Sequence, residues 1–471
     1  MKTAAARRLH PVAIAILATL FAFGSGRADE RPNIVFIIAD DLGWADVAFH
    51  GGTMPTPHLD RLRAEGAELT RHYVAPVCTP TRAALMTGRF WSRFGVTSPQ
   101  NERALPADTV TLPRALQTAG YDTCLTGKWH LGSRPEWGPN HYGFDHSYGS
   151  LAGGVGPYDH FYKKGPYSTT WHRNGTLITE TGHVTDLIAD EAVRWIEERP
   201  AAGTPYFLYV PFTAVHLPVK EPQAYLDRVP PTIVGDVPRH YAACIAHLDE
   251  AVGRIVDAVD RKGHRERTLI VFTSDNGGST AENNDTKYPA DDYPQGALTG
   301  SNRPLRGKKG DLYEGGIRVP TLARWPGRIR PGSTIGYPAH ISDWMPTFCS
   351  LAGYQPDHDL KWDGIDLTID LTGSPACHSL RLIYSVAPGF RSRALIAGDS
   401  KLIVHGPVPG LDPKADPNAP LRAELYDLAA DPGETNDLAT QNRPHLDEML
   451  ERLRTAAQAD RDAVAPREKQ P

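Results

Sequence analysis

The sequence predicts an α/β fold with a large, mainly parallel central sheet flanked by helices, followed by a small C-terminal α+β subdomain. Four short, continuously apolar segments rich in β-branched and aromatic residues are typical of strands buried on both faces. Helical patterns lie between these segments, and this alternation is typical of parallel sheets. The predicted strands are residues 33–39, 121–126, 206–211 and 269–273.

The predicted helices carry apolar side chains at helical spacing. Residues 112–119 and 239–262 are each followed by a glycine, which commonly ends a helix. Residues 183–199 place their apolar side chains on one face. Two long stretches, 132–182 and 278–304, show no regular periodicity, and such loops are usually functional rims or disordered.

The C-terminal part has a different pattern. Short strands and a closing helix replace the long apolar segments, which predicts the α+β subdomain. We therefore divide the chain into residues 1–28, a main domain at 29–370, and a subdomain at 371–471. The expected elements of the subdomain are strands at 394–397, 401–405 and 425–428 and a helix at 445–457.

Residues 1–28 have the pattern of a signal peptide. Arg7 and Arg8 precede a short apolar core, and small residues occupy the cleavage positions. The apolar run is too short to span a membrane comfortably, and no later segment has a transmembrane pattern. We expect an exported protein, periplasmic or secreted, without a stable membrane span. The net charge of -5 argues against general nucleic-acid binding but leaves room for a local basic pocket.

Side chains suited to chemistry follow all four predicted strands. Ligands of open α/β sheets bind outside the carboxyl ends of the strands. Carboxylates and an amide that converge there are oxygen ligands for Ca²⁺ or Mg²⁺. A polar residue at the end of a single strand usually has a structural role, but polar residues at the ends of four strands along one edge of the sheet favour a metal site. The residues are Asp40, Asp41, Lys128, His130, His216, Asp275 and Asn276.

The segment from Cys78 to Arg82 predicts the beginning of a helix. Thr79 can cap it, and Pro80 suits its first position. Cys78 would lie at the positive end of this helix, where free N–H groups favour an anion. Arg82 adds donors suited to sulfate or phosphate oxygens. Taken alone, Cys78 can equally be a small buried side chain and Arg82 a surface cation.

The cysteine count points to the same position. Five cysteines are an odd number for an exported protein, so at least one is unpaired or modified. If Cys78 is modified, the other four can be paired or free. The five are Cys78, Cys124, Cys244, Cys349 and Cys377.

Three motifs resemble those of the type I sulfatases. Residues 78–82 match the C-x-P-x-R signature, in which the cysteine is converted to formylglycine after translation. Gly-Lys-Trp-His-Leu-Gly at 127–132 and Asp-Asn-Gly-Gly at 275–278 fit the same family in order and spacing. Within the family, residues 215–218 and 304–309 are most similar to arylsulfatase B, the N-acetylgalactosamine-4-sulfatase.

The resemblance implies an alkaline-phosphatase-like sandwich, one bound Ca²⁺ and a nucleophile made from Cys78 by a formylglycine-generating maturase. Asp40, Asp41, Asp275 and Asn276 would bind the Ca²⁺, and residue 78 would also touch it. The strand ends predict the same four residues independently. The choice of Ca²⁺ over Mg²⁺ rests on the resemblance, because the ligand types do not separate the two ions.

The resemblance also implies catalytic roles. A hydroxyl of the hydrated formylglycine would attack sulfur, while Arg82, Lys128 and Lys309 stabilise charge on the sulfuryl oxygens. His216, helped by Lys309, would protonate the leaving alcohol, and His130 would be the base for sulfate release.

The assignment of Lys309 rests on its spacing from Glu-Gly-Gly at 314–316, and the neighbouring Lys308 can instead be a solvated surface charge.

The predicted substrate is a sulfated carbohydrate or a small sulfate ester, with galactosamine 4-sulfate as the leading candidate. Aromatic residues between 132 and 182 can stack on sugars or simply pin their loop to the domain. The alternatives are a phosphate or phosphonate ester hydrolase of the alkaline phosphatase superfamily and an inactive carbohydrate-binding relative. The aromatic residues are Tyr158, His160, Tyr162, Tyr167 and Trp171.

Overall fold

The computed structural model does not describe every residue, and the predicted signal peptide and Cys377 lie outside the described part. The described residues are 31–284, 287–290, 292–373, 381–412, 415–416 and 421–462, with side chains up to residue 459.

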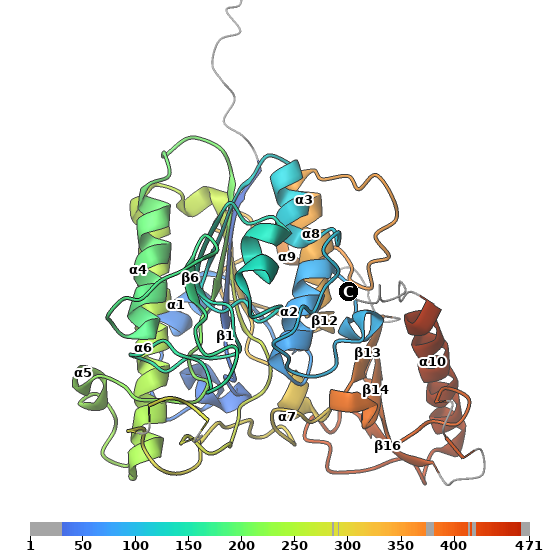
Figure 1. Ribbon diagram of the computed structural model, residues 1–471. Coiled ribbons are helices and arrows are strands. Elements are labelled where there is room, and N and C mark those ends of the chain that lie inside the picture. The colour runs from blue at the N-terminus through green and yellow to red at the C-terminus, as the bar shows by residue number, and fades with distance from the viewer. Residues whose placement is uncertain are drawn as a thin grey trace, which may run out of the picture.

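Within the described residues, a ten-stranded mixed sheet forms the centre of the molecule, in the order β11-β2-β10-β9-β1-β8-β4-β5-β6-β7 (Figure 1). The run β9-β1-β8-β4-β5 is parallel throughout, and it contains all four predicted strands. Antiparallel pairs join β10 to β9 and β6 to β5. The bounds are β1 Asn33–Ala39, β2 Ala67–Leu69, β4 Asp122–Thr126, β5 His146–Ser150, β6 Trp171–Arg173, β7 Thr176–Leu177, β8 Tyr206–Pro211, β9 Thr268–Ser274, β10 Leu322–Arg324 and β11 Ser333–Ile335.

One of the two stretches predicted to be irregular is partly regular. Residues 132–182 contain β5, β6 and β7, which extend the sheet at one edge. Their sequences carry serine, glycine, histidine and arginine instead of a continuous apolar run, so the expectation of no regular structure was wrong there. No named helix or strand falls on the described residues of 278–304, as expected.

Helices cover both faces of the sheet (Figure 1). Side chains alternate between the faces of a strand, so Phe36 of β1 packs among α2, α3 and α8, while Ile37 packs among α1, α4 and α6. The predicted helices correspond to α3, α4 and α6, with ends shifted by a few residues. The bounds are α1 Pro57–Glu65, α2 Cys78–Thr87, α3 Leu112–Thr118, α4 Val184–Glu197, α5 Gln223–Leu226, α6 Asp236–Arg261, α7 Glu314–Ile317, α8 Trp344–Ala352 and α9 Thr368–Thr372.

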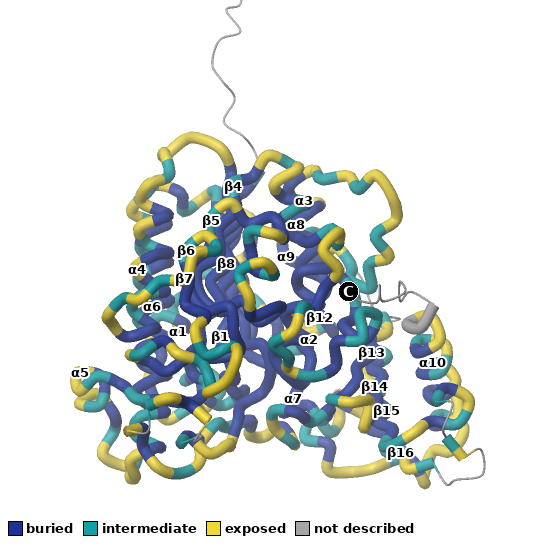
Figure 2. Tube along the Cα trace, viewed as in Figure 1, coloured by how far each residue is buried: buried dark blue, intermediate teal, exposed yellow. Residues whose placement is uncertain are grey.

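Burial follows this layered arrangement. The central strands are buried, whereas exposed residues gather on the outer loops and on the outer faces of helices such as α4 and α10 (Figure 2). In the described part of the chain, no helix combines the length and apolar character needed to cross a membrane. A pair of short strands, β3 (His72–Tyr73) and β12 (Ala339–His340), lies outside the central sheet.

The C-terminal part forms an antiparallel four-stranded sheet, β13-β14-β15-β16, with α10 packed against it (Figure 1). The three predicted strands and the closing helix overlap β14, β15, β16 and α10, whereas β13 was not predicted. The division of the chain near residue 370 stays a prediction. The bounds are β13 Leu382–Val386, β14 Ser392–Ala397, β15 Ser400–His405, β16 Arg422–Asp427 and α10 Arg443–Asp462.

A buried ion-pair network ties the C-terminal sheet to α7. Lys401 of β15 places its Nζ 2.9 Å from Glu314 Oε1 and 2.8 Å from Glu434 Oε1. The Glu314 backbone N–H donates to Glu434 Oε2 at 2.6 Å. All three side chains are fully buried, so losing one partner would leave an uncompensated charge in the interior. The network therefore fixes the start of α7.

Candidate active site

Two neighbouring strand ends bring carboxylates together. β1 and β9 are parallel neighbours, with Ala39 opposite Ser274, so the residues that follow them meet at one edge. The Asp41 N–H donates to Asp275 Oδ1 at 3.2 Å, and Asn276 Nδ2 donates to Asp41 Oδ1 at 2.8 Å. The structure therefore brings together the four residues predicted to bind a metal.

Each carboxylate of this group is paired with a cation. All three cations come from predicted catalytic positions, two on separate loop segments and the third on α2. Lys308 is exposed and its Nζ donates to Thr280 Oγ1, so it lies away from the carboxylates. The pairs are Lys128 with Asp40 (2.5 Å), Lys309 with Asp41 (2.6 Å) and Arg82 with Asp275 (2.8 Å).

Cys78 lies at the N-terminus of α2, and its side chain is buried. The helix begins at Cys78 itself, after Val77, so the prediction that Thr79 caps it was wrong. Thr79 Oγ1 instead accepts a hydrogen bond from the Gln100 N–H at 3.3 Å. Burial raises the pKa of the Cys78 thiol, although the nearby Lys128 opposes this shift. The expected position of Cys78 at a positive helix end is retained.

The first turns of α2 are bonded to the residues that follow β9 and β4. Thr81 Oγ1 donates to the Asp275 carbonyl at 2.6 Å and accepts from the Ala75 N–H at 2.9 Å. Arg82 donates to the Lys128 carbonyl at 2.9 Å besides its ion pair with Asp275. Thr81 was not predicted, because it occupies a variable position of the motif and no sequence signal marks it.

Asp41 and His130 have left-handed backbone conformations, with φ values of 65° and 56°. Such conformations are unfavourable for non-glycine residues and persist where the surrounding structure enforces them, often at functional sites. A Cβ on Gly153 would lie 2.5 Å from His130 Nε2, so only glycine allows this close approach. Burial, followed by the charge of Lys128, holds the pKa of His130 well below its usual range.

His216 lies beside the same carboxylates. Its Nε2 is 3.9 Å from Asp41 Oδ2, and its Nδ1 donates to the Leu217 carbonyl at 2.6 Å. Burial, reinforced by Lys309, lowers the pKa of His216 to about 3. The structure thus brings all six predicted catalytic side chains to one edge of the sheet.

The oxygen donors at the strand ends fit a hard divalent cation. Asp40 Oδ1 and Asn276 Oδ1 are buried without a hydrogen-bond partner in the described part of the protein, which is costly unless a ligand binds them. Burial and the charge of Asp275 raise the pKa of Asp40 to about 7. Asp40, Asp41 and His216 also offer ligand atoms within 4.8 Å of one another. Carboxylate and amide oxygens match the preference of Ca²⁺.

A second cluster, His183, Glu221 and His247, has ligand atoms equally close together. Its hydrogen bonds favour an ion-pair network instead of a metal. His183 Nδ1 accepts from the Thr185 N–H at 3.3 Å, so the proton of a neutral ring is on Nε2, which lies 3.4 Å from Glu221 Oε1. His247 Nδ1 donates to Glu221 Oε2 at 2.7 Å, and its Nε2 lies 3.2 Å from Asp186.

This network predicts a pH-dependent stability. Hydrogen bonds to Asp186 and Glu221 outweigh burial and raise the pKa of His247 from 6.5 to about 9. A raised folded-state pKa stabilises the fold fully below pH 6.5, and this contribution is lost as the pH rises through 9. The wild type should therefore lose up to roughly 3 kcal/mol more than His247→Gln between these pH values, measured by urea unfolding. Equal pH slopes in the two proteins would contradict the assignment.

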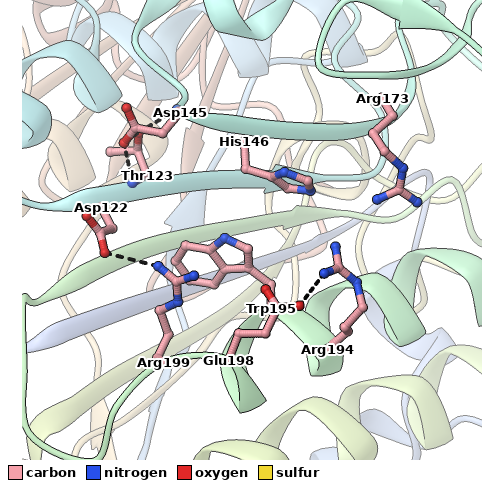
Figure 3. Close-up of a pocket in the computed structure, with 9 residues that line it drawn as sticks. All are labelled: Asp122, Thr123, Asp145, His146, Arg173, Arg194, Trp195, Glu198 and Arg199. Atoms are coloured by element: carbon pink, nitrogen blue, oxygen red, sulfur yellow. Dashed lines mark hydrogen bonds and ion pairs between the residues drawn. The ribbon is translucent and has the colours of Figure 1, made fainter.

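A separate cavity of about 550 Å³ lies at the opposite end of the sheet, near the amino ends of β4 and β5 (Figure 3). Its arginines already have partners: Arg199 pairs with Asp122 at 3.1 Å, and Arg173 pairs with Glu191 at 2.5 Å. None of the predicted site residues lines this cavity. Its lining residues are Asp122, Thr123, Asp145, His146, Arg173, Arg194, Trp195, Glu198 and Arg199.

Most aromatic residues of the first long stretch pack against the protein. Trp171 and His160 are buried and stacked with ring centroids 4.7 Å apart. Tyr167 donates to a glutamate, and Tyr162 is half-buried. Tyr158 has 44% of its surface exposed. The arrangement favours a packing role for Trp171 and His160 and leaves Tyr158 available for a ligand.

Comparison with known sequences agrees with this site. Residues 32–354 match the sulfatase family model. Mouse arylsulfatase J is 34% identical over 76% of the chain, and the chain spans 59% of the length of that relative. Dog N-acetylgalactosamine-6-sulfatase is 35% identical over 78% of the chain and 72% of its own length. The specific likeness to arylsulfatase B stays a prediction.

Solved structures extend the comparison. Ps i-CgsB in complex with k-i-k-neocarrahexaose is 28% identical, covers 93% of this chain and 95% of its own, and has a TM-score of 0.78. The PsFucS1 sulfatase from Pseudoalteromonas sp. is 26% identical over 93% and 92% of the two chains, with a TM-score of 0.74. These neighbours confirm the predicted alkaline-phosphatase-like fold. The chain therefore belongs to the sulfatase family of sulfuric ester hydrolases.

Proposed function

We propose that the protein is an exported, Ca²⁺-dependent sulfatase that removes sulfate from a sulfated carbohydrate, with residue 78 as the nucleophile. One observation carries the proposal. Cys78, at a buried helix N-terminus, lies near the lysines and carboxylates contributed by the ends of β1, β4 and β9 and by the loop before α7, namely Asp40, Lys128, Asp275 and Lys309. This is the arrangement that a sulfate ester requires: a nucleophile, fixed cations and a metal site in one buried place.

Two groups would complete the site. Asp40, Asp41, Asp275 and Asn276 would hold the Ca²⁺, which supplies positive charge for the sulfuryl oxygens. Formylglycine at position 78, made by a maturase, supplies a nucleophilic oxygen that a thiol lacks. The unpartnered oxygens of Asp40 and Asn276 support the metal site. The helix N-terminus at residue 78 favours the negative charge of the sulfate.

The side chains of this chain would bind the sulfate and move protons. Lys128, Lys309 and Arg82 provide three cations around the carboxylates, and the first two would contact sulfuryl oxygens. His216 keeps its Nδ1–H on the Leu217 carbonyl, so it would act as an imidazolium whose Nε2–H protonates the ester oxygen, and the negative charge of the bound sulfate would favour this charged form. His130 would accept the proton when sulfate is released. Burial of Lys128 and Arg82 excludes water and strengthens these charge interactions.

The substrate class is supported by the named relatives. One solved neighbour is in complex with k-i-k-neocarrahexaose, and curated relatives act on N-acetylgalactosamine 6-sulfate according to their names. A sulfated polysaccharide or its oligosaccharides would agree with export of the protein, which the pattern of residues 1–28 predicts. The phosphate-ester alternative has weaker support, because the phosphonate monoester hydrolase of Agrobacterium radiobacter is only 20% identical and shows a shared fold alone.

A substrate panel tests the proposed class. The protein, produced with a competent maturase, should release sulfate from at least one sulfated sugar faster than phosphate from 4-nitrophenyl phosphate. Galactosamine 4-sulfate, its 6-sulfate isomer, a carrageenan oligosaccharide and 4-nitrophenyl sulfate form the panel, and kcat/KM is measured for each. Faster turnover of the phosphate ester than of every sulfate would overturn the assignment. Preference for the 4-sulfate over the 6-sulfate would support the specific candidate.

A further inference from the structure

The second irregular stretch is bonded to the segment that carries His216. Asn283 is fully buried, and its Oδ1 accepts from the Val219 N–H at 2.7 Å. Its Nδ2 donates to the carbonyls of Val219 at 3.1 Å and Pro294 at 3.0 Å. One side chain therefore satisfies both backbone groups of Val219 and closes its own loop. A buried amide with three satisfied bonds is a rigid attachment.

Tyr288 makes the second attachment, closer to the catalytic ring. Its hydroxyl donates to the Leu217 carbonyl at 3.4 Å, and this is the carbonyl that accepts from His216 Nδ1 at 2.6 Å. A Cβ on Gly154 would lie 2.9 Å from the Tyr288 hydroxyl and 3.3 Å from His216 Nδ1. The hydroxyl and the imidazole thus both lie against the backbone of Gly154.

The ring of Tyr288 is held in place on several sides. It is 1% exposed, and its centroid lies 6.1 Å from that of Tyr162 and 6.3 Å from that of Tyr293. Lys163 Nζ lies 5.7 Å from the same centroid. Tyr162 and Lys163 belong to the first long stretch, so both irregular stretches fix this ring. A ring held this way places its hydroxyl reproducibly.

We propose that Tyr288 is a positioning residue for His216, resting on the proposed role of His216 in sulfate-ester hydrolysis. The Tyr288 hydroxyl holds the Leu217 carbonyl, the carbonyl orients the imidazole through Nδ1–H, and Nε2 then faces the ester oxygen. As the nucleophile's bond to sulfur forms, the bond between sulfur and the ester oxygen breaks. The electron pair stays on the ester oxygen, which takes the Nε2 proton from the imidazolium form of His216, and the ring is left neutral with its remaining proton on Nδ1.

This role predicts a dependence on the leaving group. A sugar alcohol is a poor leaving group and needs the proton in the transition state, whereas 4-nitrophenolate leaves with little help. Tyr288→Phe should reduce kcat roughly tenfold on the best sulfated sugar, the effect of losing one oriented hydrogen bond, and less than about twofold on 4-nitrophenyl sulfate. A purely structural role would reduce both rates equally.

The experiment is a double-mutant cycle measured with both substrates. Tyr288→Phe, His216→Ala and the double variant are compared with the wild type, and thermal unfolding confirms that each is folded. If Tyr288 acts through His216, its substitution should have no further effect in the His216→Ala background. Tyr293→Phe is the matched control, because its ring packs on Tyr288, and both its rates should stay at the wild-type value.

The outcomes distinguish a failure of the positioning role of Tyr288 from a failure of the proton-donor role of His216. A leaving-group-dependent loss in His216→Ala without one in Tyr288→Phe would overturn the role of Tyr288 alone. An equal effect of Tyr288→Phe with and without His216 would also overturn it. Equal losses on both substrates in His216→Ala would contradict the role of His216 as proton donor, and the role of Tyr288 with it. Sulfatase activity itself is judged separately by the substrate panel.

Discussion

Cys78→Ala is expected to reduce sulfate release to the background level, a loss of roughly 10⁴-fold or more, as for nucleophiles of other hydrolases. Alanine carries neither the thiol nor anything that a maturase can oxidise. The other groups of the site would still bind a sulfate ester, but none of them would offer an oxygen nucleophile at the helix N-terminus. The loss should therefore lie in kcat for every substrate, including aryl sulfates with good leaving groups.

The control for this variant is another buried cysteine. Cys124 lies on β4, is fully buried and has a free thiol, so Cys124→Ala removes the same atom away from the strand ends. It should retain turnover, and both variants should unfold within a few degrees of the wild type. Peptide mass spectrometry of the active wild type should find formylglycine at position 78. Wild-type turnover by Cys78→Ala would show that the proposed nucleophile is wrong.

The core of this site could be predicted from sequence because it is attached to the most regular part of the fold. The strands that carry it are buried on both faces, so their sequences are continuous apolar runs that polar residues end abruptly. β1 and β9 were therefore located closely, and Asp40 and Asp275 could be placed from them. Because the carboxyl ends of parallel strands lie at the same edge of a sheet, the convergence of these side chains could be predicted without knowing the strand order.

The features that could not be predicted depend on irregular backbone. Tyr288 acts on Leu217 across 71 residues, through a loop with no periodicity that would place it. The strands β5, β6 and β7 near one edge of the sheet are short and contain polar residues and glycine, so their pairing is decided by neighbouring strands. The start of α2 was misplaced by two residues because Thr79 is a good capping residue by composition, whereas Val77 holds that position in the structure.

Asp40→Asn and Asp275→Asn are expected to lose bound Ca²⁺ and nearly all activity. Each substitution keeps the side-chain shape but removes one of three carboxylate charges from the site, and Ca²⁺ affinity depends strongly on ligand charge. Each also leaves a fully buried cation, Lys128 or Arg82, without its carboxylate partner. Breaking a buried pair costs about 3–5 kcal/mol, so lower thermal stability should accompany the loss of metal.

The control must therefore separate metal loss from general destabilisation. Asp249 is a buried carboxylate on α6 that accepts from the backbone N–H groups of His58 and Leu59, away from the strand ends. Asp249→Asn should lower stability through those lost hydrogen bonds yet retain the Ca²⁺ and the turnover of the wild type. Metal analysis after dialysis, beside thermal unfolding and sulfate release, distinguishes the three variants. If both Asp40→Asn and Asp275→Asn keep full Ca²⁺ occupancy, the strand-end carboxylates do not form the metal site, because a Ca²⁺ ion held by them would be lost with either substitution.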